Sequence, residues 1–261
     1  MLAVRLPIFA GLLLAAGSLC AQQDQPKPIT SVAMFKVTPD KMGSFMETMK
    51  IFPPVLDKLM ADGSLLGYGV DADVLHSGGT NVAFWISGPG FAAIDKSEKA
   101  IGDAMKANPE KMKLGWGATD FGAHRDLLVR SVEGKMGKVP AGTLPFTDFS
   151  EEKVKPGKMP VAMMLFRHFE KPVLDKLVED GVIYGYSVDV EAVHTSEPGK
   201  IWFLTIMPNL AAKDKVRAAM MAAMAKMPES DRTALEEIEK DVFVASAHRD
   251  SISEALIFKT K

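Results

Sequence analysis

Cysteine is almost absent from this chain of 261 residues, which has only Cys20. An internal disulfide is therefore excluded, as is a site built from several thiolates. An excess of charge of one sign is also lacking, because the formal net charge is −2 and acidic and basic residues are interspersed. This balance gives no electrostatic reason to expect nucleic acid or an anionic membrane as a partner.

Long apolar runs are absent except near the N-terminus, where Arg5 precedes the apolar stretch 6–16 and small residues follow. The stretch is too short to be a comfortable membrane span and has the pattern of a secretory signal peptide, predicted over 1–21. Cleavage near Ala21 would remove Cys20 and leave a periplasmic or secreted protein that does not contact the membrane. Lipidation of Cys20 is the alternative, although Leu19 stands where a small residue is usual.

The most informative feature present is an internal repeat. The window 54–76 recurs at 172–194, a shift of 118 positions, with thirteen of 23 residues identical. The tripeptide Val-Ala-Met at 32–34 recurs at 161–163, and the tetrapeptide Ala-His-Arg-Asp at 123–126 recurs at 247–250. Such self-similarity indicates a duplicated structural unit.

The repeat predicts the domain boundaries. Two similar halves are expected at 31–130 and 160–250, separated by a linker at 131–159 that is rich in Gly, Pro and Lys, and followed by a tail at 251–261. In each half the hydrophobic pattern predicts the order strand, helix, strand, strand, helix, strand. The first strand of the second half is expected at 161–166, with the helix after it eleven residues shorter than in the first half.

This order is that of the ferredoxin-like βαββαβ unit, so the predicted fold class is α+β. Two tandem ferredoxin-like units resemble a fused dimeric α/β barrel, the superfamily of antibiotic-biosynthesis-type monooxygenases, NIPSNAP and EthD-like proteins. The resemblance implies two four-stranded sheets that face each other about a pseudo-twofold axis, with helices outside. It rests on element order and duplication, and no catalytic motif of these proteins can be carried over.

Two pairs of repeated residues on the long second strands are candidate site residues. His76 and His194 end these strands and are candidate catalytic bases, because histidine titrates near neutral pH; either could instead bond to a turn backbone. Strand alternation puts Tyr68 and Tyr186 on the same face as these histidines, and Asp71 and Asp189 on the opposite face. The tyrosines and aspartates are candidate ligand-binding residues, and the aspartates would line a barrel interior or face solvent.

The repeated His-Arg-Asp segments comprise His124, Arg125, Asp126, His248, Arg249 and Asp250. Histidine and aspartate two apart on a strand share a face, so each segment could offer a metal two ligands. The alternative, which we favour, is structural: arginine and aspartate pair across the interface of the halves, and histidine caps a strand end. No metal site is therefore predicted.

The sequence predicts an exported protein that binds a small, partly apolar molecule. Cofactor-independent monooxygenase chemistry, with a histidine that deprotonates an electron-rich substrate, is one interpretation. The alternative is a non-catalytic envelope or interaction protein in which the repeated residues are structural. Whether the chain is an enzyme stays open, and the sequence identifies no cofactor, substrate or oligomeric state.

Overall fold

The computed structural model describes residues 27–75, 79–193 and 198–261. Within them, eight strands form one closed barrel in which every neighbouring pair is antiparallel, in the order β1-β3-β2-β8-β5-β7-β6-β4. The strands are β1 (Ile29–Phe35), β2 (Gly67–Leu75), β3 (Val82–Gly88), β4 (Arg125–Met136), β5 (Phe146–Lys153), β6 (Gly185–Glu191), β7 (Lys200–Met207) and β8 (Arg249–Thr260).

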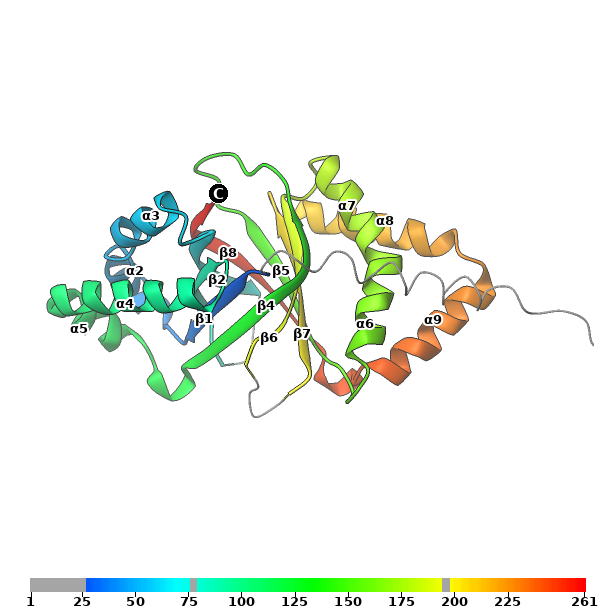
Figure 1. Cartoon of the computed structure of the whole chain (residues 1–261), viewed down its shortest axis with the longest axis horizontal. Coiled ribbons are helices and arrows are strands. Elements are labelled where there is room, and N and C mark those ends of the chain that lie inside the picture. Colours follow the sequence, from blue (N-terminus) through cyan, green and yellow to red (C-terminus); the bar gives the residue numbers. More distant parts are fainter. Residues whose placement is uncertain (1–26, 76–78, 194–197) are drawn as a thin grey trace, which may run out of the picture.

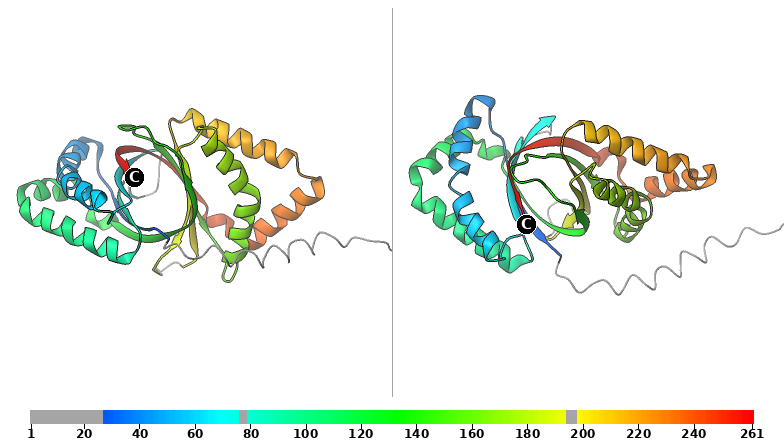
Figure 2. Two further views of the ribbon diagram at one scale, coloured as in Figure 1. Left: turned by 45° about the horizontal axis from the view of Figure 1, so that its top comes forward. Right: turned by 90° about the horizontal axis from the view of Figure 1, so that it is seen from above.

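Helices cover the barrel on two opposite sides (Figures 1 and 2). One side carries α2 (Met42–Met49), α3 (Pro53–Ala61), α4 (Phe91–Ala107) and α5 (Pro109–Ala118), and the other carries α6 (Met159–Leu165), α7 (Lys171–Glu179), α8 (Ala211–Ala225) and α9 (Glu229–Val242). A π-helical turn, η4 (Phe166–Glu170), joins α6 to α7. None of the described helices is both long and apolar enough to cross a membrane.

The barrel consists of two four-stranded arcs. The first has the order β4-β1-β3-β2 and the second β8-β5-β7-β6, so each arc places its fourth strand beside its first. The arcs join through β2–β8 and β4–β6 pairing, and both junctions contain register shifts. Because each junction pairs one half with the other, the barrel closes only when both halves are present, and closure leaves no free sheet edge.

The local sequence explains how the helices lead into the barrel. Proline at the start of α3 and α7 suits a helix N-terminus, where the missing N–H costs no hydrogen bond. Gly63 and Gly181 end these helices with φ values of 84° and 68°, a left-handed conformation that glycine adopts without steric cost. Each half then buries its own core between sheet and helices, centred on side chains such as Leu56 and Val188, both 0% exposed.

The mixed α/β fold expected from the sequence is confirmed, but several boundaries are wrong. The predicted linker at 131–159 contains the end of β4 and the whole of β5. The predicted strand at 161–166 is α6, with its continuation into η4. The predicted tail at 251–261 belongs to β8, which passes between β2 and β5.

The matching tripeptides at 32–34 and 161–163 therefore do not occupy equivalent positions, since one is in a strand and the other in a helix. In the second arc β5 occupies the position that β1 has in the first, and 117 positions separate their lumen-lining residues, such as Thr30 and Thr147. This shift is one residue less than that of the repeat window. The predicted loss of eleven residues from the second half is accordingly wrong.

Candidate functional site

A cavity of about 1060 Å³ occupies the interior of the barrel, and we call it the lumen. Alternate residues of β1, β3, β5 and β7 line it, as the period of two of a β-strand requires. Its volume is at the upper end of the range usual for small-molecule sites. Apolar side chains form much of the wall: Val32, Leu127, Val129, Phe149, Leu204 and Ile206.

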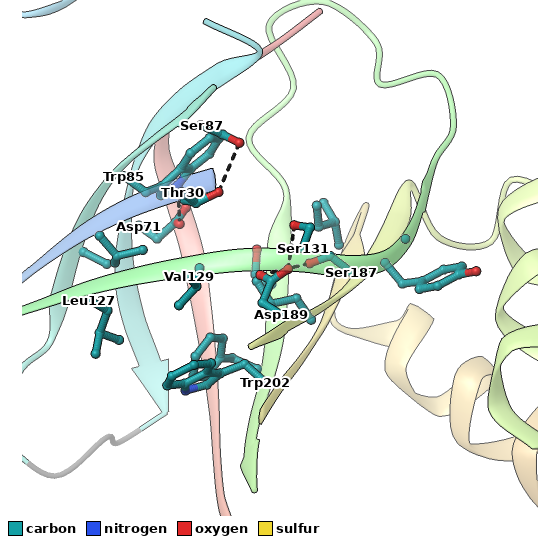
Figure 3. Close-up of a pocket in the computed structure, with 18 of the residues that line it drawn as sticks. Thr30, Asp71, Trp85, Ser87, Leu127, Val129, Ser131, Ser187, Asp189 and Trp202 are labelled. Atoms are coloured by element: carbon teal, nitrogen blue, oxygen red, sulfur yellow. Dashed lines mark hydrogen bonds between the residues drawn. The ribbon is translucent and has the colours of Figure 1, made fainter. Parts of the chain in front are cut away.

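The first polar feature of the lumen is a tryptophan–carboxylate pair. Trp85 Nε1, on β3, donates a hydrogen bond of 2.8 Å to Asp71 Oδ2, on β2 (Figure 3). The other carboxylate oxygen, Oδ1, is buried and has no hydrogen-bond partner among the described residues. Burial raises the pKa of Asp71 to about 7 and the charge of Asp73 adds to the rise, against the lowering effect of the Trp85 hydrogen bond. Near neutral pH, Asp71 can therefore both hold and release a proton.

Glycine on β2 makes room for the Trp85 ring. A Cβ at Gly69 would lie 2.7 Å from Cζ2 of Trp85 and 2.6 Å from the backbone oxygen of Ile257. Neither contact is sterically allowed, so a side chain at position 69 would displace the ring. Because Gly67 and Gly69 have no side chains, the Trp85 ring can lie against β2. Its indole N–H then reaches the Asp71 carboxylate.

Asp189, on β6, is the repeat counterpart of Asp71 but has different partners. It accepts hydrogen bonds from Ser131 Oγ at 2.6 Å and from Ser187 Oγ at 3.4 Å, one at each carboxylate oxygen (Figure 3). Burial raises the pKa of Asp189 to about 6, and the two serine hydroxyls oppose the rise. In the barrel order β6 lies directly across from β2, so the two aspartates face the lumen from opposite walls.

A third carboxylate is neutralised by an ion pair. Glu151, on β5, accepts a hydrogen bond of 2.9 Å from Trp202 Nε1 and pairs with Lys200 Nζ at 2.7 Å. The side chains of Glu151 and Lys200 are 12% and 10% exposed. Trp202 and Trp85 lie on strands that are opposite in the barrel order. The lumen therefore has aromatic and apolar walls, one compensated carboxylate, and one carboxylate with a free oxygen.

The structure separates the candidate ligand-binding residues predicted from the sequence. Asp71 and Asp189 line the lumen, whereas the hydroxyls of Tyr68 and Tyr186 lie on the helix side of the sheet. They donate hydrogen bonds to Asp57 at 2.7 Å and Asp175 at 2.6 Å. Burial and these carboxylates raise the pKa of both phenols. The candidate bases His76 and His194 lie outside the described residues.

The histidines of the His-Arg-Asp segments have bonded ring nitrogens. His124 Nδ1 lies 3.1 Å from the backbone oxygen of Met34, and its Nε2 lies 3.1 Å from Asp126 Oδ2. His248 contacts the Glu152 carboxylate and, at 3.1 Å, Asp250 Oδ2. Each histidine thus ties the start of its strand to a neighbouring strand, as a cap would.

The arginines of these segments behave differently from the expectation. Neither Arg125 nor Arg249 forms an ion pair among the described residues, so the expected arginine–aspartate pairs are not observed. Both arginines line the lumen instead. Among the described residues, no group of three or more His, Cys, Asp or Glu side chains is arranged to hold a metal ion.

Trp85, Trp202 and Glu151 are lumen residues that reasoning from the sequence missed, as it missed the Lys200 that pairs with Glu151. The alternation along β3 could have identified Trp85, because Ala83, Trp85 and Ser87 must share the face that opposes Gly67 and Asp71. Glu151 could not be found in this way, because its strand was taken for a linker.

No protein-family model matches the chain, and no curated protein matches it either. Solved structures do. A proposed monooxygenase from Fusobacterium nucleatum subsp. nucleatum has a TM-score of 0.64 at 14% identity, over 90% of this chain and 95% of that one. A second proposed monooxygenase, from Lactobacillus acidophilus, has a TM-score of 0.58 at 12% identity, over 90% and 96%.

An anthrone oxidase-like protein is also similar, with a TM-score of 0.50 at 12% identity, over 91% of this chain and 94% of that one. At such low identities the similarity concerns the fold and carries no residue roles. The chain has a monooxygenase-like α/β-barrel fold.

Proposed function

We propose that the protein binds a planar, largely apolar small molecule in the lumen and oxidises it with dioxygen, using Asp71 as the proton acceptor. The single observation that carries the proposal is the Asp71 carboxylate in the wall of the lumen, which is fixed by Trp85 and has one buried oxygen without a hydrogen-bond partner among the described residues. The free Oδ1 is the atom that would accept the proton. The raised pKa supports this role, since a general base works best when its pKa is near the working pH.

The proposed reaction converts an acidic CH₂ group beside an aromatic ring to a carbonyl group: R₂CH₂ + O₂ → R₂C=O + H₂O. Asp71 takes one proton from carbon, and the resulting carbanion forms a carbon–oxygen bond with dioxygen. The peroxide takes up that proton, and loss of the second C–H proton cleaves the O–O bond to give the carbonyl and water. The two C–H bonds supply the four electrons that reduce dioxygen. Trp85 and Trp202 offer aromatic surfaces for the substrate.

We propose further that the two halves are tandem ferredoxin-like units, the fused pair expected from the sequence. The repeat window and the repeated arc order support this interpretation. A ligand between the arcs would then contact both copies. The differing partners of Asp71 and Asp189 support a catalytic role for Asp71 alone, because the Asp189 carboxylate is already bonded at both oxygens.

Anthrone is a suitable probe, because its CH₂ group is acidic and lies between two aromatic rings. We expect the protein to accelerate dioxygen uptake by anthrone, measured with an oxygen electrode, and Asp71→Asn to lower kcat/KM by roughly 10²–10⁴-fold. The matched control is Asp189→Asn, which removes a buried carboxylate of the same lumen and should retain most of the activity.

Equal activity of Asp71→Asn and the parent would show that Asp71 is not the base. A parent protein that binds anthrone without accelerating dioxygen uptake would instead favour the non-catalytic alternative. That alternative has one observation of its own, the exposure of Met221 and Met224 on α8, which are apolar side chains that an interaction partner could cover.

Export is a prediction from the sequence that we retain as a proposal. The mature protein is expected to begin near Gln22 and to be found in the periplasm or outside the cell. Mass spectrometry of the protein recovered from the extracytoplasmic fraction would give the N-terminal residue. A soluble cytoplasmic protein that keeps Met1 would contradict export.

A further inference from the structure

Arg125 and Arg249 begin β4 and β8, and the topology places them at one end of the barrel. Every neighbouring pair of strands is antiparallel, and β4 and β8 are four steps apart in either direction around the closed order. They therefore run in the same direction on opposite sides of the lumen. Their first residues face each other across the same end.

Both arginines line the lumen. On β4 Arg125 alternates with Leu127 and Val129. On β8 the consecutive residues Arg249, Asp250 and Ser251 line it. The next residue of each segment is an aspartate, and its carboxylate is held by the histidine that precedes the arginine. The geometry of the His-Arg-Asp segment thus bonds the acid to the imidazole and leaves the guanidinium without an ion pair in the part of the chain that the structure describes.

The other carboxylates near this end do not neutralise the arginines. Glu151, which is opposite Arg249 in the register, is paired with Lys200. Glu152 contacts His248. Asp73, on the β2 wall of the lumen, has an interaction of its own and would offer one negative charge against two positive ones. Two guanidinium groups at one end of a cavity, without an ion pair among the described residues, can donate hydrogen bonds to an anionic group of a ligand.

We propose that the lumen ligand is an aromatic carboxylate, with its ring system between the apolar walls and its carboxylate between Arg125 and Arg249. This inference rests on the proposed function for the location of the ligand, and it adds the chemical class. Guanidinium binds carboxylate through charge-assisted hydrogen bonds, often two in parallel. The duplicated arginines let the anionic group be held from both sides. The carboxylate would also fix which part of the ring system lies deeper in the lumen, where Asp71 is.

Two probes of the same shape distinguish the contribution of the carboxylate to binding from that of the ring system. The first is 2-naphthoate, and the second is 2-naphthamide, which keeps the ring and loses the charge. By isothermal titration calorimetry we expect the parent protein to bind 2-naphthoate roughly tenfold or more tightly than 2-naphthamide. Arg125→Gln and Arg249→Gln should each remove part of the preference for 2-naphthoate, about threefold each if the parent's preference is tenfold. Neither variant should change the affinity for 2-naphthamide.

The matched control is Arg130→Gln, because Arg130 is an exposed arginine of the same strand whose position faces away from the lumen. It should leave both affinities unchanged. Equal affinity of the parent for the two probes would overturn the carboxylate assignment while leaving lumen binding intact. If Arg130→Gln lost as much affinity for 2-naphthoate as Arg125→Gln, the carboxylate assignment would also be overturned, because the loss would then follow from the net charge alone. If neither probe binds the parent, both the inference and lumen binding fail.

Discussion

Asp71→Asn is expected to raise the free energy of unfolding by about 2–4 kcal/mol at pH 8 and to leave it nearly unchanged at pH 4. In the unfolded chain this carboxyl has its ordinary pKa of 3.8, whereas burial in the folded protein raises its pKa to about 7. Between these values the folded state binds more protons than the unfolded state. The stability contributed by Asp71 therefore falls as pH rises from about 4 to 7, and asparagine, which cannot ionise, avoids the loss.

Urea unfolding of the parent and the variant at several pH values would measure this difference. Comparison of the two proteins cancels the contributions of all other titrating groups. The control is Asp95→Asn, at an exposed side chain of α4, which should change the free energy of unfolding little. A gain of the same size at pH 4 and pH 8 would mean that ionisation of Asp71 is not the cause.

Asp71→Asn is also expected to slow the oxidation of anthrone. Aspartate at position 71 would therefore lower stability and raise activity. An enclosed carboxylate with an unbonded oxygen is destabilising, and the hydrogen bond from Trp85 Nε1 does not require a charge, since an asparagine oxygen could also accept it. Strain or desolvation of this kind is typical of functional sites. The two readouts of one variant, greater stability and lower activity, are therefore stronger evidence together than either is alone.

The strongest part of the fold could be predicted because the repeat contains a whole helix–turn–strand unit. Within 54–76 and 172–194 the prolines, the Asp-Gly turn and the alternation along the strand agree with one another. The alternation also separated Tyr68 from Asp71 correctly, since the phenol is in the core under the helices and the carboxylate lines the lumen. Local rules suffice where each of them favours the same structure.

The first strand of the second half could not be found by the same rules. In β5, with the sequence FTDFSEEK, polar residues occur on both faces, because one face lines a partly polar lumen. The sequence of α6, MPVAMML, is apolar and short, and a brief apolar run fits a buried strand as well as a buried helix. The choice between them is made by closure of the barrel, which is a long-range requirement.

A one-residue difference between the two halves explains why Trp202 was not predicted to line the lumen. Asp71 and Asp189 are 118 positions apart, but their cross-strand partners, Ala83 and Trp202, are 119 apart. A shift of one residue moves every side chain of a strand to the other face. Trp202 therefore enters the lumen, although the repeat aligns it with Phe84, which faces the helices. Sequence comparison of the halves cannot detect this change, whereas strand register does.

Lys200→Met is expected to destabilise the protein by about 3–5 kcal/mol, because it leaves the Glu151 carboxylate uncompensated inside the barrel. For a chain of this length the loss corresponds to a Tm lower by roughly 10 °C. The double variant with Glu151→Gln should recover most of the stability, since a neutral glutamine oxygen can still accept the hydrogen bond from Trp202 Nε1.

Lys240→Met is the matched control, because Lys240 forms an ion pair with Glu237 at the same distance of 2.7 Å. The side chains of Lys240 and Glu237 are both more than 60% exposed, so solvent screens the ion pair and Tm should hardly change. Thermal unfolding of the four proteins, followed by circular dichroism, would give the comparison. If Lys200→Met and Lys240→Met melted together, Glu151 would have to be solvated or protonated without its lysine. The lumen would then be wetter than its walls indicate, and the argument for a desolvated Asp71 would weaken with it.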